Sequence, residues 1–342
     1  MTLHGRALRI ALMLVAALVL VEVATHAALV PVSRDLDRLR SFDDRAHSLA
    51  TAPAPRIAFI GNSVTDRVQP ELMRAEWAAL TGDSLAVDKF VAYSSNLATW
   101  YWISEHFFWK PGVKLDLIVM TYYDAMGLAD SEVMDVGNLA RFFTDRDDRP
   151  ALFEHDLKTL PQRADYLLST VSLAFAMRER IRDRSLNQIP GYQKFATTTN
   201  EFNFKYEQEH AAPAIRPDPT YHTLRRFVAR AQQEGVLVCF VAFRPRPSGS
   251  PASPAYELQP EALRLIAGSG MLHLDLRRME ELSASMYEDA VHLNELGTPV
   301  YSRRLTRELA RVLRPGHPTA GRLPAKMTYS RNAGTGQSPD RQ

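Results

Sequence analysis

Short apolar runs alternate with stretches of helical spacing through most of this chain. Runs typical of buried strands lie at 57–60, 85–91, 115–121, 236–243 and 271–274. Apolar residues recur at helical spacing at 64–80, 100–108, 219–234, 261–266, 276–286 and 295–313. This alternation predicts a three-layer α/β domain, in which a doubly wound parallel sheet of about five strands carries helices on both faces.

The alternation is interrupted after Asp124. Residues 125–215 are polar and show few strand signals; one strongly apolar helix is predicted at 166–181 and a loop at 187–206. A structureless loop of this size is uncommon in a compact domain, so we interpret the stretch as a helical insertion over one end of the sheet. Whether it shapes a substrate site or serves as a packing or partner surface stays open.

The N-terminus combines basic residues with a long apolar segment. Arg6 and Arg9 precede an apolar run over 10–21, Glu22 follows, and apolar character resumes up to Val32. This arrangement fits a signal peptide or a membrane anchor of about 20 residues. We favour an uncleaved anchor over 1–32 in the cytoplasmic membrane, with the remainder of the chain in the periplasm. A cleaved signal peptide is the alternative and would indicate an ordinary secreted lipase or esterase, with a lipid-like ester as substrate.

Two further segments flank the α/β domain, which we place at 56–314. Residues 33–55 contain charged residues with apolar positions at helical spacing, followed by a linker with two prolines, and predict a juxtamembrane helix. Residues 315–342 are poor in apolar side chains and predict a disordered tail.

Composition and charge narrow the function classes. The chain has 41 basic and 39 acidic residues, a net charge of +2, and no basic cluster interleaved with aromatic residues, which argues against nucleic-acid binding. Cys239 is the only cysteine, so an intrachain disulfide and a cysteine-based metal site are excluded. Because nucleotide-binding loops and metal-ligand spacings are also absent from the sequence, we expect neither a cofactor nor a metal.

Ser63 lies where the first predicted strand meets the following helix. Gly61 ends the apolar run, and Asn62 and Ser63 form the turn. Free backbone N–H groups at the start of a helix would face the same space as the serine hydroxyl, which suits a nucleophile that generates an oxyanion. The same pattern is also typical of a simple helix cap.

A second candidate group, Asp289 and His292, precedes the last predicted helix. At a spacing of three residues, the carboxylate can accept the Nδ1 hydrogen of the histidine and leave Nε2 free as a base. Both residues follow the fifth predicted strand, so they are expected at the same sheet edge as Ser63. The alternative is that Asp289 and Asn294 cap the helix beside an exposed histidine.

Together the two segments resemble the SGNH/GDSL hydrolase superfamily. Gly61-Asn62-Ser63-Val64-Thr65-Asp66 is similar to its first block, Gly-Asp-Ser-x-Thr-Asp, with Asn62 in place of the aspartate. Asp289-Ala290-Val291-His292 is similar to its last block, Asp-x-x-His. The likeness covers about 56–125 and 217–312, and the two blocks are specific only as a pair. It implies a flavodoxin-like fold and catalysis by Ser63, His292 and Asp289.

The middle blocks of this family are altered here. Its second block supplies a glycine N–H to the oxyanion, whereas residues 93–96 read Tyr-Ser-Ser-Asn, so that Ser95 or Asn96 would donate. Its third block supplies an asparagine side chain at the position that Tyr123 occupies. The resemblance thus implies an oxyanion hole built from Ser63, Ser95 and Asn96, with Tyr123 or the Asn96 side chain as the third donor.

The resemblance implies acyl transfer from an ester. The anchor and the altered blocks are most similar to extracytoplasmic members of the family that act on acyl or acetyl esters of cell-envelope or exopolysaccharide glycans, often with a membrane protein that supplies the acyl group. A non-catalytic glycan-binding or scaffold protein of a membrane complex is the alternative. Aromatic residues at 100–102 and 109 could stack on sugars, although their helical spacing favours a place in the core.

Overall fold

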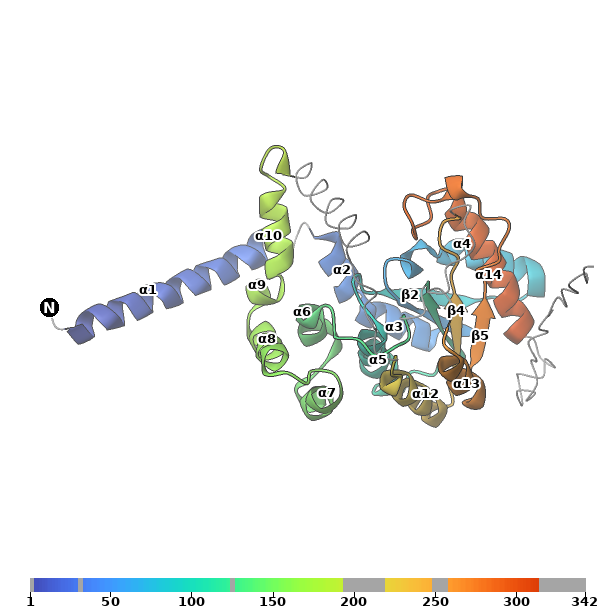
Figure 1. Cartoon of the computed structure of the whole chain (residues 1–342), viewed down its shortest axis with the longest axis horizontal. Helices are drawn as coiled ribbons and strands as arrows, with labels where there is room; N and C mark the ends of the chain where they lie inside the picture. Colours follow the sequence, from blue (N-terminus) through green and yellow to red (C-terminus); the bar gives the residue numbers. More distant parts are fainter. Residues whose placement is uncertain (1–2, 30–32, 124–126, 193–218, 248–257, 314–342) are drawn as a thin grey trace, which may run out of the picture.

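A parallel sheet of five strands forms the centre of the computed structural model, which describes residues 3–29, 33–123, 127–192, 219–247 and 258–313. The strands are β1 (Arg56–Gly61), β2 (Ala86–Val91), β3 (Leu117–Tyr122), β4 (Leu237–Ala242) and β5 (Leu272–Asp275). Their order in the sheet is β2-β1-β3-β4-β5, and all neighbours run parallel (Figure 1). The predicted parallel α/β sheet is confirmed.

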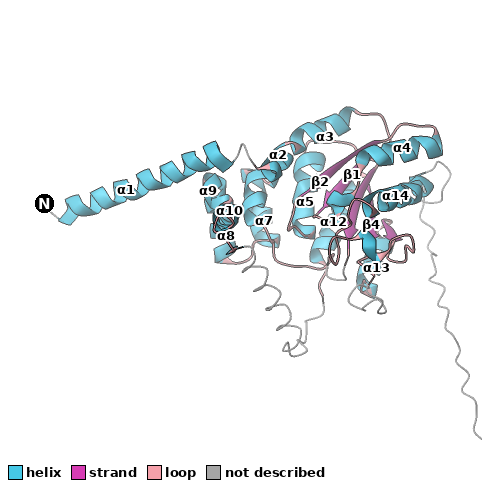
Figure 2. Ribbon diagram, turned by 90° about the horizontal axis from the view of Figure 1, so that it is seen from above, coloured by secondary structure: helices cyan, strands magenta, loops and turns pink. Residues whose placement is uncertain are grey.

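Helices cover both faces of this sheet (Figure 2). One face carries α4 (Pro70–Thr81) and α14 (Gly297–Leu313), and the other carries α3 (Phe42–Thr51), α5 (Leu97–Ser104), α12 (His222–Glu234) and α13 (Pro260–Gly268). Successive side chains of a strand point to opposite faces of the sheet. Phe59 of β1 therefore packs in the core under α4 and α14, and Ile60 packs in the core on the other face. The carboxyl ends of β1, β3 and β4 therefore emerge from a layer that is buried on both sides.

The helix predicted at 64–80 begins later than expected. A short 3₁₀ turn covers Thr65–Arg67, Val68 and Gln69 are extended, and α4 starts at Pro70. Proline is favoured in the first turn of a helix but disfavours helical angles in the residue before it, so Gln69 cannot belong to the helix. Ser63 therefore lies in a loop seven residues ahead of α4, and not at the helix start.

The helix predicted at 276–286 is also wrong. Only Ala284–Met286 forms a 3₁₀ turn in this stretch. Leu276, Met279 and Leu282 are buried at a spacing of three residues, which imitates a helical stripe. The Asp275 carboxylate accepts the Arg277 N–H at 3.0 Å and holds the chain in a turn directly after β5.

From Val136 to Leu186 the described part of the insertion is mostly helical, whereas residues 127–135 form turns and irregular structure. Its helices are α6 (Val136–Asn138), α7 (Arg149–His155), α8 (Leu160–Val171), α9 (Leu173–Ala176) and α10 (Arg178–Leu186), with short π and 3₁₀ turns at Leu139–Phe143 and Arg146–Asp148. The single helix predicted at 166–181 is divided because Ser172 adopts extended angles and its hydroxyl caps α9. Residues 193–215 of the predicted insertion, which include most of the predicted loop, lie outside the described residues.

Residues 33–51, where one helix is predicted, form two helices whose apolar side chains are buried. These are α2 (Arg34–Arg40) and α3, and together they bury Leu36, Leu39, Phe42, Ala46 and Leu49. The Phe42 ring lies 5.2 Å from the Phe90 ring and 5.5 Å from the Phe107 ring. The α/β domain therefore begins near residue 33, ahead of its first strand.

Helix α1 (Leu3–Ala24) projects from the body of the molecule and continues into a π turn at Thr25–Leu29 (Figure 1). Within the described ranges, no helix has the length and apolar character needed to cross a membrane. The Glu22 carboxylate accepts hydrogen bonds from the Ser172 hydroxyl and from the N–H groups of Leu173 and Ala174, at 2.7 to 3.1 Å. Glu22 thereby joins the end of α1 to the first turn of α9.

We expect Gly61→Ala to destabilise the fold by about 1–3 kcal/mol, because overpacking a dense core forces its neighbours to move. A methyl group at this position would lie 2.8 Å from Cβ of the fully buried Thr65 and closer still to its hydroxyl. Gly268→Ala is the matched control, since its methyl group would meet no atom within 4 Å among the described residues. Chemical denaturation measures both, and equal stability of the two variants would contradict the prediction.

Candidate active site

Ser63, His292 and Asp289 form one hydrogen-bonded relay. Ser63 Oγ lies 2.8 Å from His292 Nε2, and Asp289 Oδ2 lies 2.7 Å from His292 Nδ1. Ser63 and His292 are 229 positions apart in the chain, and the carboxyl end of β1 and the loop before α14 bring them together. The structure thus brings all three predicted catalytic residues together, with His292 within hydrogen-bonding distance of both Ser63 and Asp289.

The turn that carries Ser63 is closed by its neighbours. Asn62 Oδ1 accepts the Val64 N–H at 3.2 Å, and Asn62 O accepts the Asp66 N–H at 3.3 Å. A short polar side chain that bonds the backbone two residues ahead is typical of such turns. Asn62 can therefore close the turn in place of the aspartate of the Gly-Asp-Ser-x-Thr-Asp pattern. Ser63 stays partly exposed in this turn.

The loop that carries the base is a small hairpin. Tyr287 and Leu293 form an antiparallel bridge, and the Glu288 N–H donates to His292 O at 2.8 Å. Inside it, Asp289 Oδ1 accepts the N–H groups of Val291 and His292 at 2.8 and 2.7 Å. One carboxylate oxygen thus shapes the turn while the other orients the imidazole.

The Asp289 carboxylate is held in its charged form. Burial by itself would raise the pKa of Asp289, but hydrogen bonds from the His292 ring and from the backbone N–H groups of His292 and Val291 outweigh it and lower that pKa to about 2. The negative charge favours the tautomer with hydrogen on Nδ1, so Nε2 can accept the proton of the Ser63 hydroxyl.

We expect Asp289→Asn to lower kcat for an ester substrate about 10²- to 10⁴-fold, because the amide cannot stabilise an imidazolium. It should also change the pH dependence of stability. A folded pKa of about 2, below the ordinary 3.8, gives a stabilisation that is complete above about pH 5 and is lost as the pH falls from about 4 to 2. The Tm difference between wild type and variant should therefore shrink on acidification.

Asp83→Asn, at an exposed aspartate in the turn after α4, controls for the loss of a surface carboxylate. A Tm difference for Asp289→Asn that is independent of pH between about 2 and 6 would contradict the assigned charge state.

The candidate oxyanion turn at 93–96 has an unusual backbone. Ser94 adopts φ +50°, the left-handed region that favours glycine. The Ser95 hydroxyl donates to Ala92 O at 2.5 Å and accepts from Trp100 Nε1 at 2.9 Å. In the described part of the chain, no acceptor is bound to the N–H of Ser63 or of Ser95. Backbone donors are thus present at both predicted positions.

The two candidates for a third oxyanion donor are the side chains of Asn96 and Tyr123. Asn96 caps α5 through Oδ1, which lies 3.4 Å from the Thr99 N–H, and its amide donates to Ser131 Oγ and Glu132 O at 2.8 and 2.7 Å. Because these partners occupy both ends of the Asn96 side chain, only its backbone N–H is left for the role predicted here. Tyr123 follows β3, is half-buried and packs against the core that contains Val64 and Leu293.

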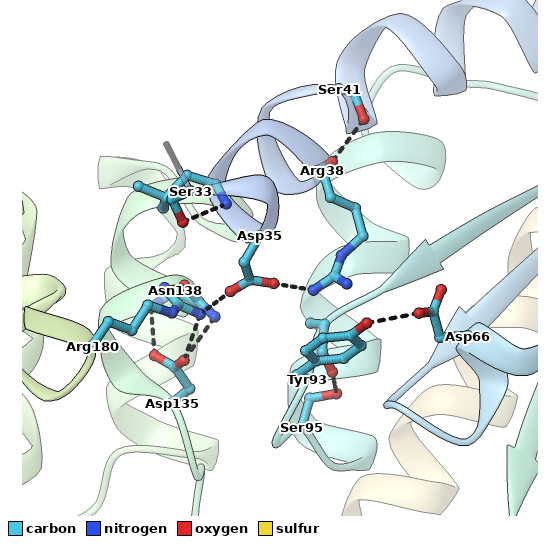
Figure 3. Close-up of polar contacts among 12 residues, drawn as sticks. Ser33, Asp35, Arg38, Ser41, Asp66, Tyr93, Ser95, Asp135, Asn138 and Arg180 are labelled. Atoms are coloured by element: carbon cyan, nitrogen blue, oxygen red, sulfur yellow. Dashed lines mark hydrogen bonds and ion pairs between the residues drawn. The ribbon is translucent and has the colours of Figure 1, made fainter. Parts of the chain in front are cut away.

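Two ionic contacts that the sequence did not indicate lie beside the relay. Arg67, two residues beyond Thr65 in the turn after Ser63, pairs at 2.5 Å with Glu288, which directly precedes Asp289. Asp66 accepts the Tyr93 hydroxyl at 2.7 Å and lies 3.1 Å from Lys89 Nζ (Figure 3 shows the first of these contacts). Burial would raise the pKa of Asp66, but Tyr93 and Lys89 lower it below its usual range. No sequence pattern marks such pairs, because their members lie far apart in the chain.

A hollow of about 520 Å³ adjoins the turn after Ser63 and the start of α14. Most of its lining is polar or charged and includes Asp66, Arg67, Gln69, Glu71, Lys89 and Glu295. The tryptophans considered for sugar stacking are instead core residues, since Trp100, Trp102 and Trp109 are each at most 3% exposed.

Among the described residues, one group has metal-ligand geometry. His106, Asp145 and Asp148 present ligand atoms within 4.8 Å of one another. The ammonium group of Lys110 already contacts both carboxylates, so a cation occupies the position that a metal would need.

Comparison with known proteins gives similarity to solved structures alone, and at low sequence identity. No family model and no curated protein matches the sequence. Among solved structures it is similar to a lipase/acylhydrolase from Enterococcus faecalis, with 12% identity, a TM-score of 0.40 and coverage of 76% of this chain and 98% of the other. It is also similar to LAE5, an alpha/beta hydrolase enzyme from the metagenome of Lake Arreo, Spain, with 14% identity, a TM-score of 0.38 and coverage of 77% and 97%. We therefore argue the function from the site itself.

Proposed function

We propose that this chain is a serine-dependent ester hydrolase or O-acyltransferase of the SGNH type. The observation that carries the proposal is the relay, in which Ser63 Oγ lies 2.8 Å from His292 Nε2 and Asp289 Oδ2 lies 2.7 Å from His292 Nδ1. A hydroxyl, an imidazole and a carboxylate in this order are the parts that nucleophilic acyl transfer needs.

The reaction proceeds through an acyl-enzyme. Ser63 Oγ attacks the ester carbonyl while its proton passes to His292 Nε2, and Asp289 stabilises the imidazolium. The oxyanion accepts hydrogen bonds from the N–H groups of Ser63 and of the 93–96 turn. His292 then gives its proton to the leaving alcohol. Water or a sugar hydroxyl attacks the acyl group, loses its proton to His292 and releases Ser63.

The proposed substrate is an acyl or acetyl ester of a cell-envelope or exopolysaccharide glycan. The hollow that adjoins the turn after Ser63 supports this choice, because charged and amide groups line it and suit hydroxyl-rich ligands better than a long acyl chain. In the transferase form of the reaction, a membrane protein would supply the acyl group.

We place the protein at the cytoplasmic membrane with its catalytic domain in the periplasm. Although no described helix has the character of a membrane span, the apolar side chains of helix α1 are more than half exposed and need a cover, which supports contact with a membrane. These residues are Ile10, Leu12, Met13, Leu14, Val15, Leu18, Val19, Leu20, Val21 and Val23.

Covalent labelling tests the nucleophile directly. The full chain is treated with a fluorophosphonate, which phosphonylates activated serines, and the adduct is located by peptide mass spectrometry. We expect modification of Ser63, and slower modification while an excess of acetate ester competes for the same serine. Labelling that is no greater at Ser63 than at the exposed Ser84 would contradict an activated serine.

A non-catalytic glycan-binding or scaffold protein is the second candidate function. It is favoured by the altered third block, since Tyr123 stands at the asparagine position and the Asn96 amide donates to Ser131 and Glu132. One oxyanion donor lowers the reaction barrier by about 3–4 kcal/mol. The loss of one donor would therefore slow the reaction without abolishing it. Binding of an acetylated glycan without any release of acetate would favour the scaffold.

A further inference from the structure

The turn at 93–96 contains a left-handed backbone conformation, although it has no glycine. Ser94 holds φ +50°, and a residue other than glycine is unfavourable there unless its surroundings fix it. On the downstream side, the bonds of Ser95 to Ala92 O and Trp100 and the cap made by Asn96 supply that restraint. On the upstream side, the restraint depends on Tyr93.

Tyr93 is held at two points (Figure 3). Its hydroxyl donates to Asp66 Oδ2 at 2.7 Å, which links the turn to the segment that follows Ser63. The guanidinium carbon of Arg38 lies 3.8 Å from the centroid of its ring, close enough for a cation–π interaction. Arg38 belongs to α2, so a helix that precedes the first strand reaches the candidate oxyanion turn.

Arg38 is itself fixed from the side of the insertion. Asp35 binds Arg38 and also accepts Arg180 of α10 at 2.5 Å (Figure 3). Arg180 donates in addition to Asn138 Oδ1 at 3.0 Å. The Arg38 side chain is only 15% exposed, so water weakens its contact with the ring little. A continuous series of contacts thus runs from the insertion through α2 to Tyr93 and Asp66.

We propose that Arg38 is a positioning residue for the oxyanion turn: by holding Tyr93 it keeps Ser94 in the left-handed conformation in which the backbone of 94–96 can donate to the oxyanion. This assignment rests on the proposed function. It gives α2 a role in the reaction, although α2 contributes no group to the relay. It also explains how a turn without glycine keeps a glycine-like backbone.

The simpler reading is that Arg38 only fastens α2 to the domain, and a rescue experiment separates the two. Arg38→Met, Ser94→Gly and the double variant are compared in the full chain with p-nitrophenyl acetate as substrate. Arg45→Met is the matched control, because Arg45 of α3 bonds Lys89 O at 3.0 Å and makes no contact with the turn among the described residues.

We expect Arg38→Met to lower kcat about tenfold with KM changed less than about twofold, since the lost interaction acts on the transition state. Ser94→Gly in the same chain should restore most of the lost kcat, because glycine adopts the turn without help. Arg45→Met should leave kcat within about twofold of wild type. A loss that Ser94→Gly does not restore, or an equal loss in Arg45→Met, would overturn the proposal.

A crystal structure of Arg38→Met measures the turn without any substrate. A change of φ at Ser94 away from +50° supports the positioning role, and an unchanged turn refutes it. If the wild-type chain proves inactive on every ester while the turn still depends on Arg38, the proposed function fails, and only the structural effect of Arg38 on the turn stands. Failure of the two is therefore distinguishable.

Discussion

Replacement of Ser63 by alanine is expected to lower esterase turnover at least about 10³-fold. Ser63 Oγ is the only relay atom able to bond covalently to the acyl group, and it lies 2.8 Å from the nitrogen that accepts its proton. Removing one partly exposed hydroxyl should change the free energy of unfolding by less than about 1 kcal/mol. Hydrolysis of p-nitrophenyl acetate and thermal unfolding measure the two effects.

Ser84→Ala serves as the control, since Ser84 is an exposed serine in the loop before β2. It should hydrolyse the ester at the wild-type rate. If Ser63→Ala and Ser84→Ala were equally active, Ser63 would be the structural turn residue that its local sequence also allows.

Replacement of His292 by alanine is expected to have a comparable effect, about 10³-fold or more on kcat. The loss should not add to that of Ser63→Ala, because the two side chains act as one unit and removing either already abolishes nucleophilic attack. Added imidazole should restore part of the activity of His292→Ala, since the His292 side chain is 24% exposed and its removal leaves a space open to solvent. Imidazole should not restore Ser63→Ala.

His47→Ala, at an exposed histidine of α3, gives the reference for loss of a histidine away from the relay. Full additivity of the His292 and Ser63 effects in the double variant would show that the two residues act independently, contrary to the relay.

The sheet was predictable because its strands are buried on both faces and therefore appear in the sequence as short apolar runs. Each strand lies within two residues of its predicted range, and Ser63, Asp289 and His292 meet where parallel strands end. The start of α4 was predictable as well, from Pro70, but the apolar spacing of 64–80 concealed it. Asn96 likewise carries a local signal, because asparagine directly before a helix is a common cap.

Other features had no local signal. The packing of α2 and α3 on the domain depends on contacts such as Phe42 with Phe107, which join residues far apart in the chain. The placement of Arg38 over Tyr93 depends on the folded arrangement of α2 and the turn, and a cation over an aromatic ring leaves no periodic trace in the sequence. The sequence therefore indicated the reacting residues more readily than the residues that hold them.

The 229 positions between Ser63 and His292 have a consequence for the timing of activity. Closing so long a loop requires β3, β4 and β5 to be in place before the base can reach the nucleophile. A nascent or partly unfolded chain would contain the serine turn but no paired imidazole. In the proposed hydrolase, esterase activity would thus report completed folding, because an unfinished chain lacks the paired imidazole.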